Sequence, residues 1–208
     1  PDQYVAELFN EYSGRFEQHL VETLQYEVPW IMRQMYDKAT GKDAAPLKRA
    51  LDLGCGTGLI GRTFEDAVEA IDGVDLADKM VEKARESGYY DDLRAGELVA
   101  TLQDLSAQGR HYDLITAGDV FVYVGRLDET FSLVKKVIEP GGWFFFSIES
   151  SDESDVILRR SGRYAQSDSY IRELAEEHGF SVDVAEPVAV RLEFTKPING
   201  FVYQLRAD

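Results

Sequence analysis

Residues that could do chemistry gather in one short stretch in the first third of the chain. Asp52 stands near the end of an apolar run, and three glycines follow it at alternate positions, Gly54, Gly56 and Gly58. Glycine can adopt positive φ and lets a ligand lie against the backbone, and N–H groups at the start of a following helix attract an anion. This pattern predicts a buried strand, a ligand-binding loop and a helix, with Cys55 as a small loop residue rather than a nucleophile.

Two acids narrow the choice of ligand. The helix start favours a carboxylate, whereas Asp52 favours a cation, so a ligand with an α-amino group and a carboxylate on one carbon suits both. A second strand over residues 67–74 leads to Asp75, about 20 residues beyond the glycines, where sheets of this kind bind the hydroxyls of a ribose. An amino-acid tail and a ribose together predict S-adenosylmethionine (SAM), whose demethylated product is S-adenosylhomocysteine (SAH).

A nicotinamide or flavin dinucleotide is the main alternative ligand. Its fingerprint spaces the glycines as G-x-G-x-x-G, but Leu59 occupies the position of the third glycine and Gly58 comes one residue early. A pyrophosphate would also meet the negative charge of Asp52. A strand–helix turn without a ligand is a further alternative, which two acids in register disfavour.

These motifs resemble those of the class I SAM-dependent methyltransferases. The resemblance is carried by the stretch 52–58, by Gly73-Val74-Asp75-Leu76 and by Lys79-Met80, and it extends from about Lys48 to the end of the chain. The N-terminal stretch resembles one branch, the predicted methyltransferases often attached to tetratricopeptide repeats. The family implies a Rossmann-like three-layer α/β/α sandwich, whose seven-stranded, mostly parallel sheet has its last strand antiparallel. We expect one globular domain, with a helical lid over residues 1–46 and the SAM-binding domain over residues 47–208.

Composition limits the substrate and the compartment. The chain has 208 residues and a net charge of −16, which repels phosphate backbones and anionic lipid and disfavours nucleic-acid and membrane partners. The sequence shows neither an apolar run long enough for a membrane span nor a secretory leader, and its single cysteine suits a reducing cytoplasm. We therefore expect a cytoplasmic protein with a small-molecule substrate, and the oligomeric state stays open.

The pattern also predicts most of the regular elements. Helices are expected over residues 4–9, 15–21, 28–36, 58–65, 78–87, 127–138 and 170–178, and strands over 50–53, 67–75, 93–95, 111–117, 143–150, 180–193 and 200–206. Residues 151–155 and 159–164 are expected to be loops. Ala77 stands where this family often begins a helix with a hydroxyl residue, so we expect Asp78 to cap that helix instead.

The resemblance implies which positions hold the cofactor. A lid aromatic, Tyr12 or Phe16, would close over SAM, with Arg15 near its carboxylate, while Glu97 and Leu98 would meet the adenine. A glutamate at a helix N-terminus is an equally good explanation of Glu97. The full expected cofactor set is Tyr12, Arg15, Asp52, Gly54, Cys55, Gly56, Gly58, Asp75, Leu76, Met80, Glu97, Leu98, Gly118 and Asp119.

The acceptor is expected beside residues 118–123, because ligands of open α/β sheets lie outside the carboxyl ends of the strands where strand order reverses. This stretch has no Asn/Asp-Pro-Pro-aromatic run, which argues against methylation of base amino groups or glutamine amides. Gln166 also stands where the resembling branch often has a histidine. Arginines at positions 159, 160 and 163 could bind an anion on the substrate or simply pair with nearby acids in a solvated loop. The expected substrate-binding residues are Phe121, Tyr123, Glu149, Arg163 and Tyr164.

No single catalytic base follows from the sequence, and no metal site is expected. The candidate catalytic residues are Asp119, Tyr123, Tyr164 and His19. Asp119 is the best placed of them, although family members often use that position to bind SAM. The leading hypothesis is a methyltransferase acting on a small molecule at O, N or C, and the alternative is a SAM-binding regulatory or assembly protein without turnover. A nicotinamide-dependent oxidoreductase is the third possibility.

Overall fold

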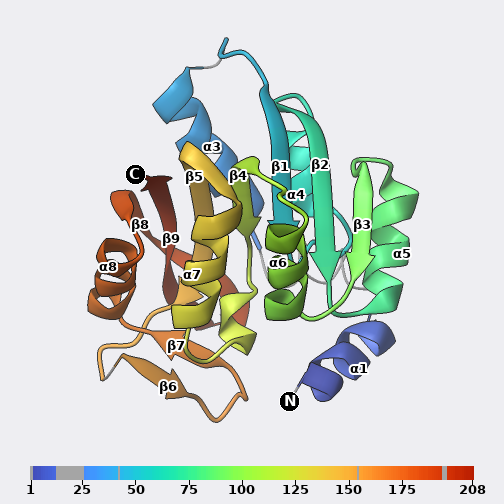
Figure 1. The fold of residues 1–208 in the computed structure, drawn as a ribbon. Helices are drawn as coiled ribbons and strands as arrows, with labels where there is room; N and C mark the ends of the chain where they lie inside the picture. The colour runs from blue at the N-terminus through green and yellow to red at the C-terminus, as the bar shows by residue number, and fades with distance from the viewer. Residues whose placement is uncertain (1, 13–25, 42, 154, 194–195) are drawn as a thin grey trace.

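A seven-stranded sheet in the order β3-β2-β1-β4-β5-β9-β8 forms the centre of the molecule. The computed structural model describes the whole chain except residues 1, 13–25, 42, 154 and 194–195 (Figure 1). Strands β2, β1, β4 and β5 pair in parallel, whereas β9 runs antiparallel to both of its neighbours. Because β9 lies between β5 and β8, the sheet differs from the order 3-2-1-4-5-6 of a dinucleotide-binding Rossmann sheet.

The strands have the following bounds: β1 Leu47–Leu53, β2 Val68–Asp75, β3 Asp92–Ala95, β4 Tyr112–Ala117, β5 Ile138–Glu149, β6 Val156–Leu158, β7 Tyr164–Gln166, β8 Phe180–Glu193 and β9 Lys196–Ala207. The helices are α1 Asp2–Tyr12, α3 Val28–Thr40, α4 Leu59–Phe64, α5 Asp78–Ser87, α6 Leu98–Ala107, α7 Asp128–Val137 and α8 Asp168–Glu177, with one 3₁₀ turn, η2 Phe121–Tyr123. The seven strands of the main sheet match the expected ones within a few residues.

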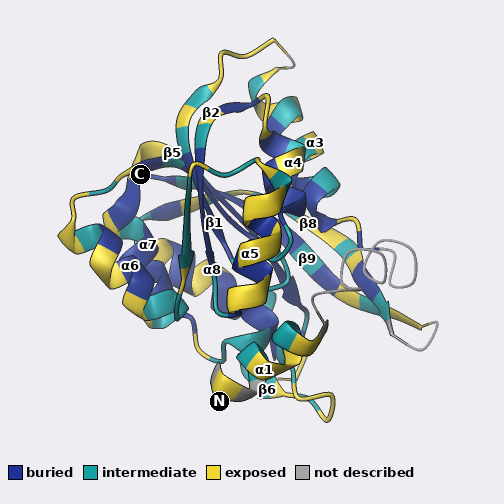
Figure 2. Ribbon diagram, turned by 90° about the vertical axis from the view of Figure 1, so that its right-hand side faces the viewer, coloured by how far each residue is buried: buried dark blue, intermediate teal, exposed yellow. Residues whose placement is uncertain are grey.

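Helices cover both faces of the sheet, as the family resemblance implied. Helices α6, α7 and α8 pack on one face around Phe144 and Phe146, and α3 and α4 pack on the other face around Leu114 and Phe145 (Figures 1 and 2). Alternate residues of β5 thus enter opposite cores, as a strand covered on both sides requires. None of the helices in the described ranges is both long and apolar enough to cross a membrane.

The carboxyl ends of the parallel strands meet at one edge of the sheet, and the segments outside the three layers gather there. Helix α1 lies at this edge beside α5, and the two-stranded hairpin β6–β7 lies at the same edge below α7 (Figure 1). The sequence pattern did not predict this hairpin, because its strands are three residues long and flank a polar turn. Its register is set by pairing of Val156 with Gln166 and of Leu158 with Tyr164.

Helix α5 begins in an unusual way. Its bounds are those predicted, and Gly88 ends it in a left-handed conformation with φ +77°. Its N-cap residue, Ala77, supplies no side-chain hydrogen bond. Instead, the N–H of Lys79 donates to the side-chain oxygen of Asn10 on α1, at 3.0 Å. The start of α5 is therefore hydrogen-bonded to the side chain of a residue far away in the sequence, whereas Asp78, the expected cap, lies in the first turn of the helix and is not its N-cap.

Candidate functional site

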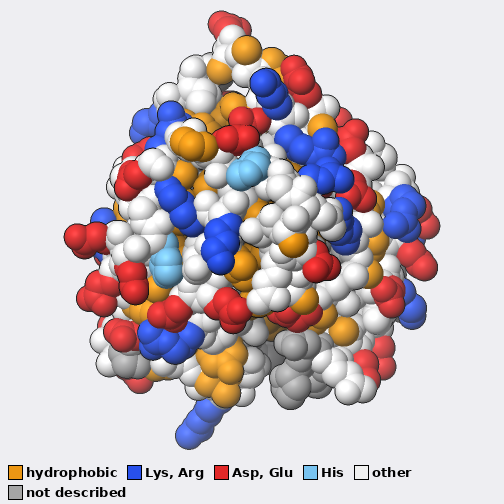
Figure 3. Space-filling model, viewed as in Figure 1, with side chains coloured by type: hydrophobic (Ala, Val, Ile, Leu, Met, Phe, Trp, Pro, Cys, Tyr) orange, Lys and Arg blue, Asp and Glu red, His pale blue; other side chains and the backbone are white. Residues whose placement is uncertain are grey.

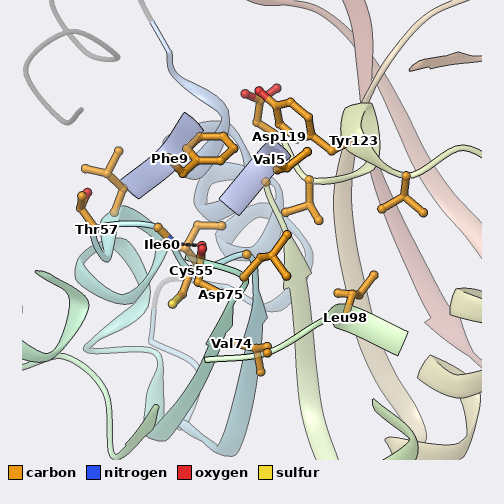
Figure 4. Close-up of a pocket in the computed structure, with 18 of the residues that line it drawn as sticks. Val5, Phe9, Cys55, Thr57, Ile60, Val74, Asp75, Leu98, Asp119 and Tyr123 are labelled. Carbon is orange, nitrogen blue, oxygen red and sulfur yellow. Dashed lines mark hydrogen bonds between the residues drawn. The ribbon is translucent and has the colours of Figure 1, made fainter. Parts of the chain in front are cut away.

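A pocket opens at the carboxyl edge of β1, β2 and β4 (Figure 4). Its walls come from the loop after β1, the ends of β2 and β3, the segment after β4, and helix α1. The lining residues are Val5, Phe9, Tyr26, Pro29, Gly54, Cys55, Gly56, Thr57, Leu59, Ile60, Val74, Asp75, Leu76, Gly96, Glu97, Leu98, Gly118, Asp119, Val120, Tyr123 and Val124. Nine of the fourteen expected cofactor positions are among them.

The glycine loop is shaped by backbone conformations that side chains rarely adopt. Gly54, Gly56 and Gly58 have φ values of +68°, +53° and +103°. A Cβ on Gly54 would also lie 2.3 Å from a methyl carbon of Val120, so the loop after β1 and the segment after β4 touch at this point. Gly58 begins α4 and does not line the pocket. Because α4 has only six residues, the N–H groups of the loop matter more for an anion than the helix dipole does.

Asp75 lies at the centre of the pocket wall (Figure 4). One carboxylate oxygen accepts from the N–H of Gly56 at 2.9 Å, and the other accepts from the N–H of Ala77 at 2.9 Å. Burial raises the pKa of Asp75, while these two N–H groups oppose the rise by stabilising the charged form. A carboxylate can accept about four hydrogen bonds, so Asp75 keeps acceptor capacity for two ligand hydroxyls.

Asp52, the second expected acid, does not line the pocket. It is 1% exposed and lies beneath the glycine loop, where it accepts from the hydroxyls of Tyr90 at 2.6 Å and Thr116 at 2.9 Å. Burial raises the pKa of Asp52 to about 7, the charge of Asp75 adds to the rise, and the two hydroxyls oppose it. The expectation of direct contact between Asp52 and an ammonium group is thus corrected: Asp52 is buried outside the pocket wall, so its charge can act on the pocket only from a distance.

Two further side chains of the loop bear on a ligand. The hydroxyl oxygen of Thr57, beside the pocket, is buried without a hydrogen-bond partner among the described residues. A buried unpaired hydroxyl is costly, and it can donate to a ligand that enters. Burial raises the pKa of the Cys55 thiol well above its ordinary value, which keeps it protonated and a poor nucleophile.

Three of the four residues expected on the adenosine side lie in the pocket wall. Leu76, Glu97 and Leu98 line the pocket, whereas Met80 is fully buried in the core of α5 and does not. Met80 lies four residues after Leu76, on the inward face of its helix, which removes it from the pocket. The carboxylate of Glu97 accepts from two N–H groups at the start of α6, at 2.9 and 2.8 Å. Glu97 is therefore the helix cap that its position allowed, and it also borders the pocket.

Helix α1 covers the pocket with Val5 and Phe9 (Figure 4). The ring of Phe9 meets the ring of Tyr123 edge-on, with their centroids 5.4 Å apart. The sequence had favoured Tyr12 or Phe16 as the lid aromatic. Tyr12 ends α1, and its side chain lies outside the described part of the molecule, as do Arg15, Phe16 and His19. Phe9 falls on the same face as Val5 because the two are four residues apart on a helix.

The described residues of the predicted lid that follow α1 lie partly in the pocket wall and partly in the core. Tyr26 and Pro29 line the pocket, and the Tyr26 hydroxyl would lie 2.7 Å from a Cβ on Gly118. Met32 and Tyr36 of α3 are buried against the sheet instead. Burial also raises the pKa of Tyr26 well above its ordinary value, with the charges of Asp119 and Asp52 adding to the rise.

The acceptor end of the pocket is marked by Asp119 and Tyr123 (Figure 4). Asp119 has φ +57°, a strained value for a residue with a side chain. Its carboxylate pairs with Arg191 of β8 at 3.2 Å. Burial raises the pKa of Asp119 to about 6, and the positive charge of Arg163 opposes the rise. Arg191 was not predicted as a site residue, since in the sequence it reads as one polar position of a long edge strand.

Of the five expected substrate-binding residues, Tyr123 lines the pocket and Arg163 contacts it from outside the pocket wall. The hydroxyl of Tyr123 accepts from Arg163 at 2.9 Å, and the Arg163 guanidinium lies 5.4 Å from the centre of the Tyr123 ring. Glu149 is 1% exposed, hydrogen-bonds to Arg191 and does not line the pocket. Tyr164 packs its ring against Gly125 and does not line the pocket either.

Phe121 takes no part in the pocket wall, which corrects its expected role. It is fully buried in the core, where its ring meets Phe144 edge-on and Phe146 at a tilt. Gln166 supports the turn that contains Phe121: its amide nitrogen lies 3.1–3.3 Å from the carbonyl oxygens of Phe121, Val124 and Gly125. The glutamine that departs from the family pattern thus fixes the backbone that carries Tyr123. Among the described residues, no group of three His, Cys, Asp or Glu side chains could hold a metal ion.

Comparisons with known proteins agree with this geometry. Residues 50–142 match the model of a methyltransferase domain family. A ubiquinone biosynthesis O-methyltransferase of Bordetella pertussis is 31% identical over 101 residues, which is 48% of this chain and 42% of that protein. The corresponding protein of Thiobacillus denitrificans is 29% identical over 120 residues, 55% of this chain and 50% of its own length. The chain thus spans about half the length of the curated relatives it matches.

Solved structures share the fold over nearly the whole chain. The N-methyltransferase NodS of Bradyrhizobium japonicum, in complex with SAH, superposes with a TM-score of 0.74 at 12% identity and covers 97% of each chain. The magnesium protoporphyrin IX methyltransferase of Synechocystis, with bound SAH, superposes with a TM-score of 0.71 at 16% identity, over 100% of this chain and 99% of its own. At these identities the likeness concerns the fold.

Proposed function

We propose that this chain, which has the class I SAM-dependent methyltransferase fold and a matching methyltransferase domain at residues 50–142, transfers a methyl group from SAM to a small molecule. The observation that carries the proposal is Asp75. It lines the pocket at the tip of β2 and is held by the N–H groups of Gly56 and Ala77. A carboxylate at the end of the second strand is suited to the two hydroxyls of a ribose.

The other pocket groups fit the remaining parts of SAM. The unpaired Thr57 hydroxyl and the loop N–H groups can donate to a carboxylate. The carboxylate of Asp52 favours a nearby ammonium group, which would in turn stabilise its ionised form, and it disfavours the pyrophosphate of a dinucleotide. Leu76 and Leu98 offer apolar contacts to an adenine, next to the capping carboxylate of Glu97. The order of the sheet, with β9 inserted beside β5, likewise supports SAM over a nicotinamide cofactor.

When bound, SAM supplies an electrophilic methyl group, and the chain's own residues need only position the acceptor and exclude water. Val5 and Phe9 cover the pocket from α1, so α1 serves as the lid. Tyr123 forms a wall whose ring face stabilises positive charge by ~1–2 kcal/mol. Asp119, whose pKa burial raises to about 6, is the group best placed to take a proton from the acceptor, since a base works best near the operating pH.

The finer assignments of the chain rest on the sequence. We place it in the branch of methyltransferases often attached to tetratricopeptide repeats, on the resemblance of its N-terminal stretch. The single cysteine, Cys55, is buried and is a free thiol, which suits a reducing cytoplasm. The net charge of −16 supports a small molecule over nucleic acid as the acceptor. Figure 3 shows acidic and basic side chains intermixed on one face of the molecule rather than a continuous basic surface.

Calorimetric titration with SAM, SAH and NADH tests the proposal. We expect SAM and SAH to bind and NADH not to bind. Asp75→Ala should weaken SAM binding by about 100-fold, since each hydrogen bond to a charged group contributes ~1.5–3 kcal/mol. Asp78→Ala is the matched control, because this exposed aspartate lies three residues away, outside the pocket. Unchanged affinity in Asp75→Ala, or NADH binding in place of SAM, would contradict the assignment.

Turnover is tested separately, by measuring SAH release with a panel of small hydroxyl, amine and carboxylate acceptors. We expect SAH to form with at least one of these classes and Asp119→Asn to lower kcat while SAM affinity changes little. Tight SAM binding with no SAH from any acceptor would instead favour the SAM-binding protein without turnover.

A further inference from the structure

Three guanidinium groups converge behind the acceptor end of the pocket. Arg191 comes from β8, and Arg159 and Arg163 come from the turn of the β6–β7 hairpin. All three face the carboxylate of Glu149 at the end of β5: Arg191 hydrogen-bonds to it, and the nearest nitrogens of Arg159 and Arg163 lie 3.7 and 3.9 Å away. We refer to Arg159, Arg163 and Arg191 as the arginine cluster.

The hairpin turn fixes two members of this cluster relative to each other. The N–H of Arg159 donates to the carbonyl of Arg163 at 2.8 Å, and the N–H of Gly162 donates to the carbonyl of Arg159 at 2.9 Å. Gly162 has φ +79°, which the tight turn requires. Arg160, between them in the sequence, is exposed and forms no ion pair with Glu149 in the structure. The turn therefore points two of its three arginines inward.

The cluster carries one more positive charge than its acidic partners. Within the described residues, the carboxylates paired with it are Glu149 and Asp119, so three cations face two anions. Arg191 and Glu149 are 2% and 1% exposed, and Arg163 is 22% exposed. Removing charge from water is costly unless it is balanced, and the chain as a whole carries −16. A local surplus of positive charge in so acidic a protein calls for an anion.

The hydrogen bonds show which members have donors left for that anion. Arg191 uses one terminal nitrogen on Asp119 and the other on Glu149. Arg159 and Arg163 each direct one terminal nitrogen to a neutral oxygen, the Ser150 carbonyl at 2.6 Å and the Tyr123 hydroxyl at 2.9 Å. Their separations from Glu149 exceed the length of a hydrogen bond. Arg159 and Arg163 can thus each donate to an incoming oxyanion without giving up a hydrogen bond to a carboxylate.

The cluster also adjoins the place where the acceptor must lie. Tyr123 lines the pocket, and it is Tyr123 that Arg163 contacts through both its hydroxyl and its ring. Asp119 lines the same end and holds Arg191. None of the three arginines lines the pocket itself, but the cluster contacts two residues of its wall, Asp119 and Tyr123, from behind.

We propose that Arg159 and Arg163 form an anion subsite and that the methyl acceptor is a small molecule carrying a carboxylate. This inference rests on the proposed methyltransferase function. A carboxylate carries one negative charge, which balances the surplus of the cluster, and its two oxygens match the paired N–H donors of a guanidinium. Arg191 is the positioning residue that keeps Glu149 and Asp119 paired.

The test uses the full chain saturated with SAH, with acetate as the probe and the arginine side-chain Nε–H signals as the NMR readout. Signals are assigned with Arg159→Lys and Arg163→Lys. We expect acetate to shift the signals of residues 159 and 163 until they saturate. The dissociation constant of acetate should be at least 10-fold lower than that of chloride at equal ionic strength. Acetamide, which carries no charge, should leave the signals in place. Arg163→Gln should weaken acetate binding at least 10-fold. Arg160→Gln, which removes the same charge from the exposed side of the turn, should not.

The outcomes separate this proposal from the one it rests on. Shifts that follow chloride and acetate alike, or an Arg163→Gln variant that binds acetate as the wild type does, would overturn the subsite. Inorganic phosphate binding more tightly than acetate would overturn the carboxylate as its ligand. SAH binding is measured on the same samples. A wild type that does not bind SAH would contradict the methyltransferase assignment. A wild type that binds SAH but shows no acetate site would refute the subsite alone. Melting curves and the charge-retaining Arg163→Lys show whether a variant has merely lost its fold.

Discussion

The two ends of the pocket are built in different ways. The cofactor end consists of backbone held in unusual conformations, with Gly54 and Gly56 at positive φ and Asp75 fixed by two N–H groups. At the acceptor end, two lining residues are held by long side chains from separate elements: Arg163 contacts Tyr123, and Arg191 contacts Asp119. One end is thus local in the sequence, and the other exists only after the sheet and the hairpin have formed.

The two ends also differ in charge. Buried acids, Asp52 and Asp75, dominate the cofactor end: burial raises the pKa of both, and the charge of Asp75 adds to the rise in the pKa of Asp52. The acceptor end carries a surplus of guanidinium groups. This difference places buried acids at one end of the pocket and the proposed anion subsite behind the other end, so that a sulfonium ligand and an anionic acceptor would each be directed to their own side.

The largest effect is expected from breaking the acceptor end at Arg191. Arg191→Met leaves Glu149 and Asp119 without their shared partner, and removing one member of a buried ion pair typically costs 3–5 kcal/mol. Chemical denaturation should show a loss of this size. Adding Glu149→Gln should recover part of it, because one of the two carboxylates that lost the hydrogen bond of Arg191 is then neutral. A loss below about 1 kcal/mol, or a strictly additive double variant, would show that the cluster does not act as a unit.

The next largest effect is expected at Gly54, in the glycine loop of the cofactor end. Gly54→Ala should weaken SAM binding more than 100-fold, because a Cβ there would lie 2.3 Å from Val120. It would push the loop after β1 away from the segment after β4. Gly109→Ala is the matched control: its φ of +65° is close to the +68° of Gly54, and a Cβ there meets nothing within 4 Å. It carries the same backbone strain, ~1–2 kcal/mol, and should keep its SAM affinity. Equal affinities in the two variants would contradict the close-contact account.

The sequence predicted the cofactor end well because that end depends on neighbours in the chain. A strand, alternate glycines and an acid at the next strand tip leave a local pattern, and Asp75 lies where that pattern put it. Asp52 was misplaced because period and spacing fix which face of a strand a residue is on, but not whether loop backbone covers it. Tyr90 and Thr116 occupy its carboxylate, and neither could be paired with it without the fold.

Only part of the acceptor end could be predicted from the sequence, because its residues are brought together by the fold and are not neighbours in the chain. Three arginines near residue 160 stood out, but nothing distinguished Arg160, which faces solvent, from Arg159 and Arg163, which turn inward. Arg191 lies 28 or more residues further along the chain, in a strand whose partner segment had to fold before it could reach Glu149. Long-range pairing of this kind carries no local signature.

A third prediction concerns the buried acid beneath the glycine loop. The pKa of Asp52 is about 7 in the folded protein, against 3.8 ordinarily. Between these values the folded state keeps a proton that the unfolded state has lost, so the free energy of unfolding falls as the pH rises. From pH 5.5 to 7.5 this amounts to about 2 kcal/mol.

Asp52→Asn removes that titration, and denaturation at three pH values measures it. The stability difference between wild type and variant should change with pH in favour of the variant as the pH rises, whereas Asp78→Asn, at an exposed position, should follow the wild type. Parallel pH profiles for wild type and Asp52→Asn would show that Asp52 keeps an ordinary pKa. Asp52 would then no longer distinguish the cofactor end from the acceptor end by a raised pKa.

The smallest effect is expected at helix α1, which touches both ends. Phe9 meets Tyr123 at the acceptor end, and Asn10, the next residue, accepts from the N–H of Lys79 at 3.0 Å behind the cofactor end. Loss of an N-cap costs about 1 kcal/mol. Asn10→Ala should therefore loosen α1 from α5 and raise the SAM dissociation rate by about fivefold, measured by stopped-flow fluorescence. Asn10→Asp keeps a capping oxygen and should restore most of the wild-type rate, and Glu11→Ala, exposed on the same helix, should have no effect. If Asn10→Ala releases SAM at the wild-type rate, α1 is held by Val5 and Phe9 alone, and the two ends are joined through the ligand rather than through the lid.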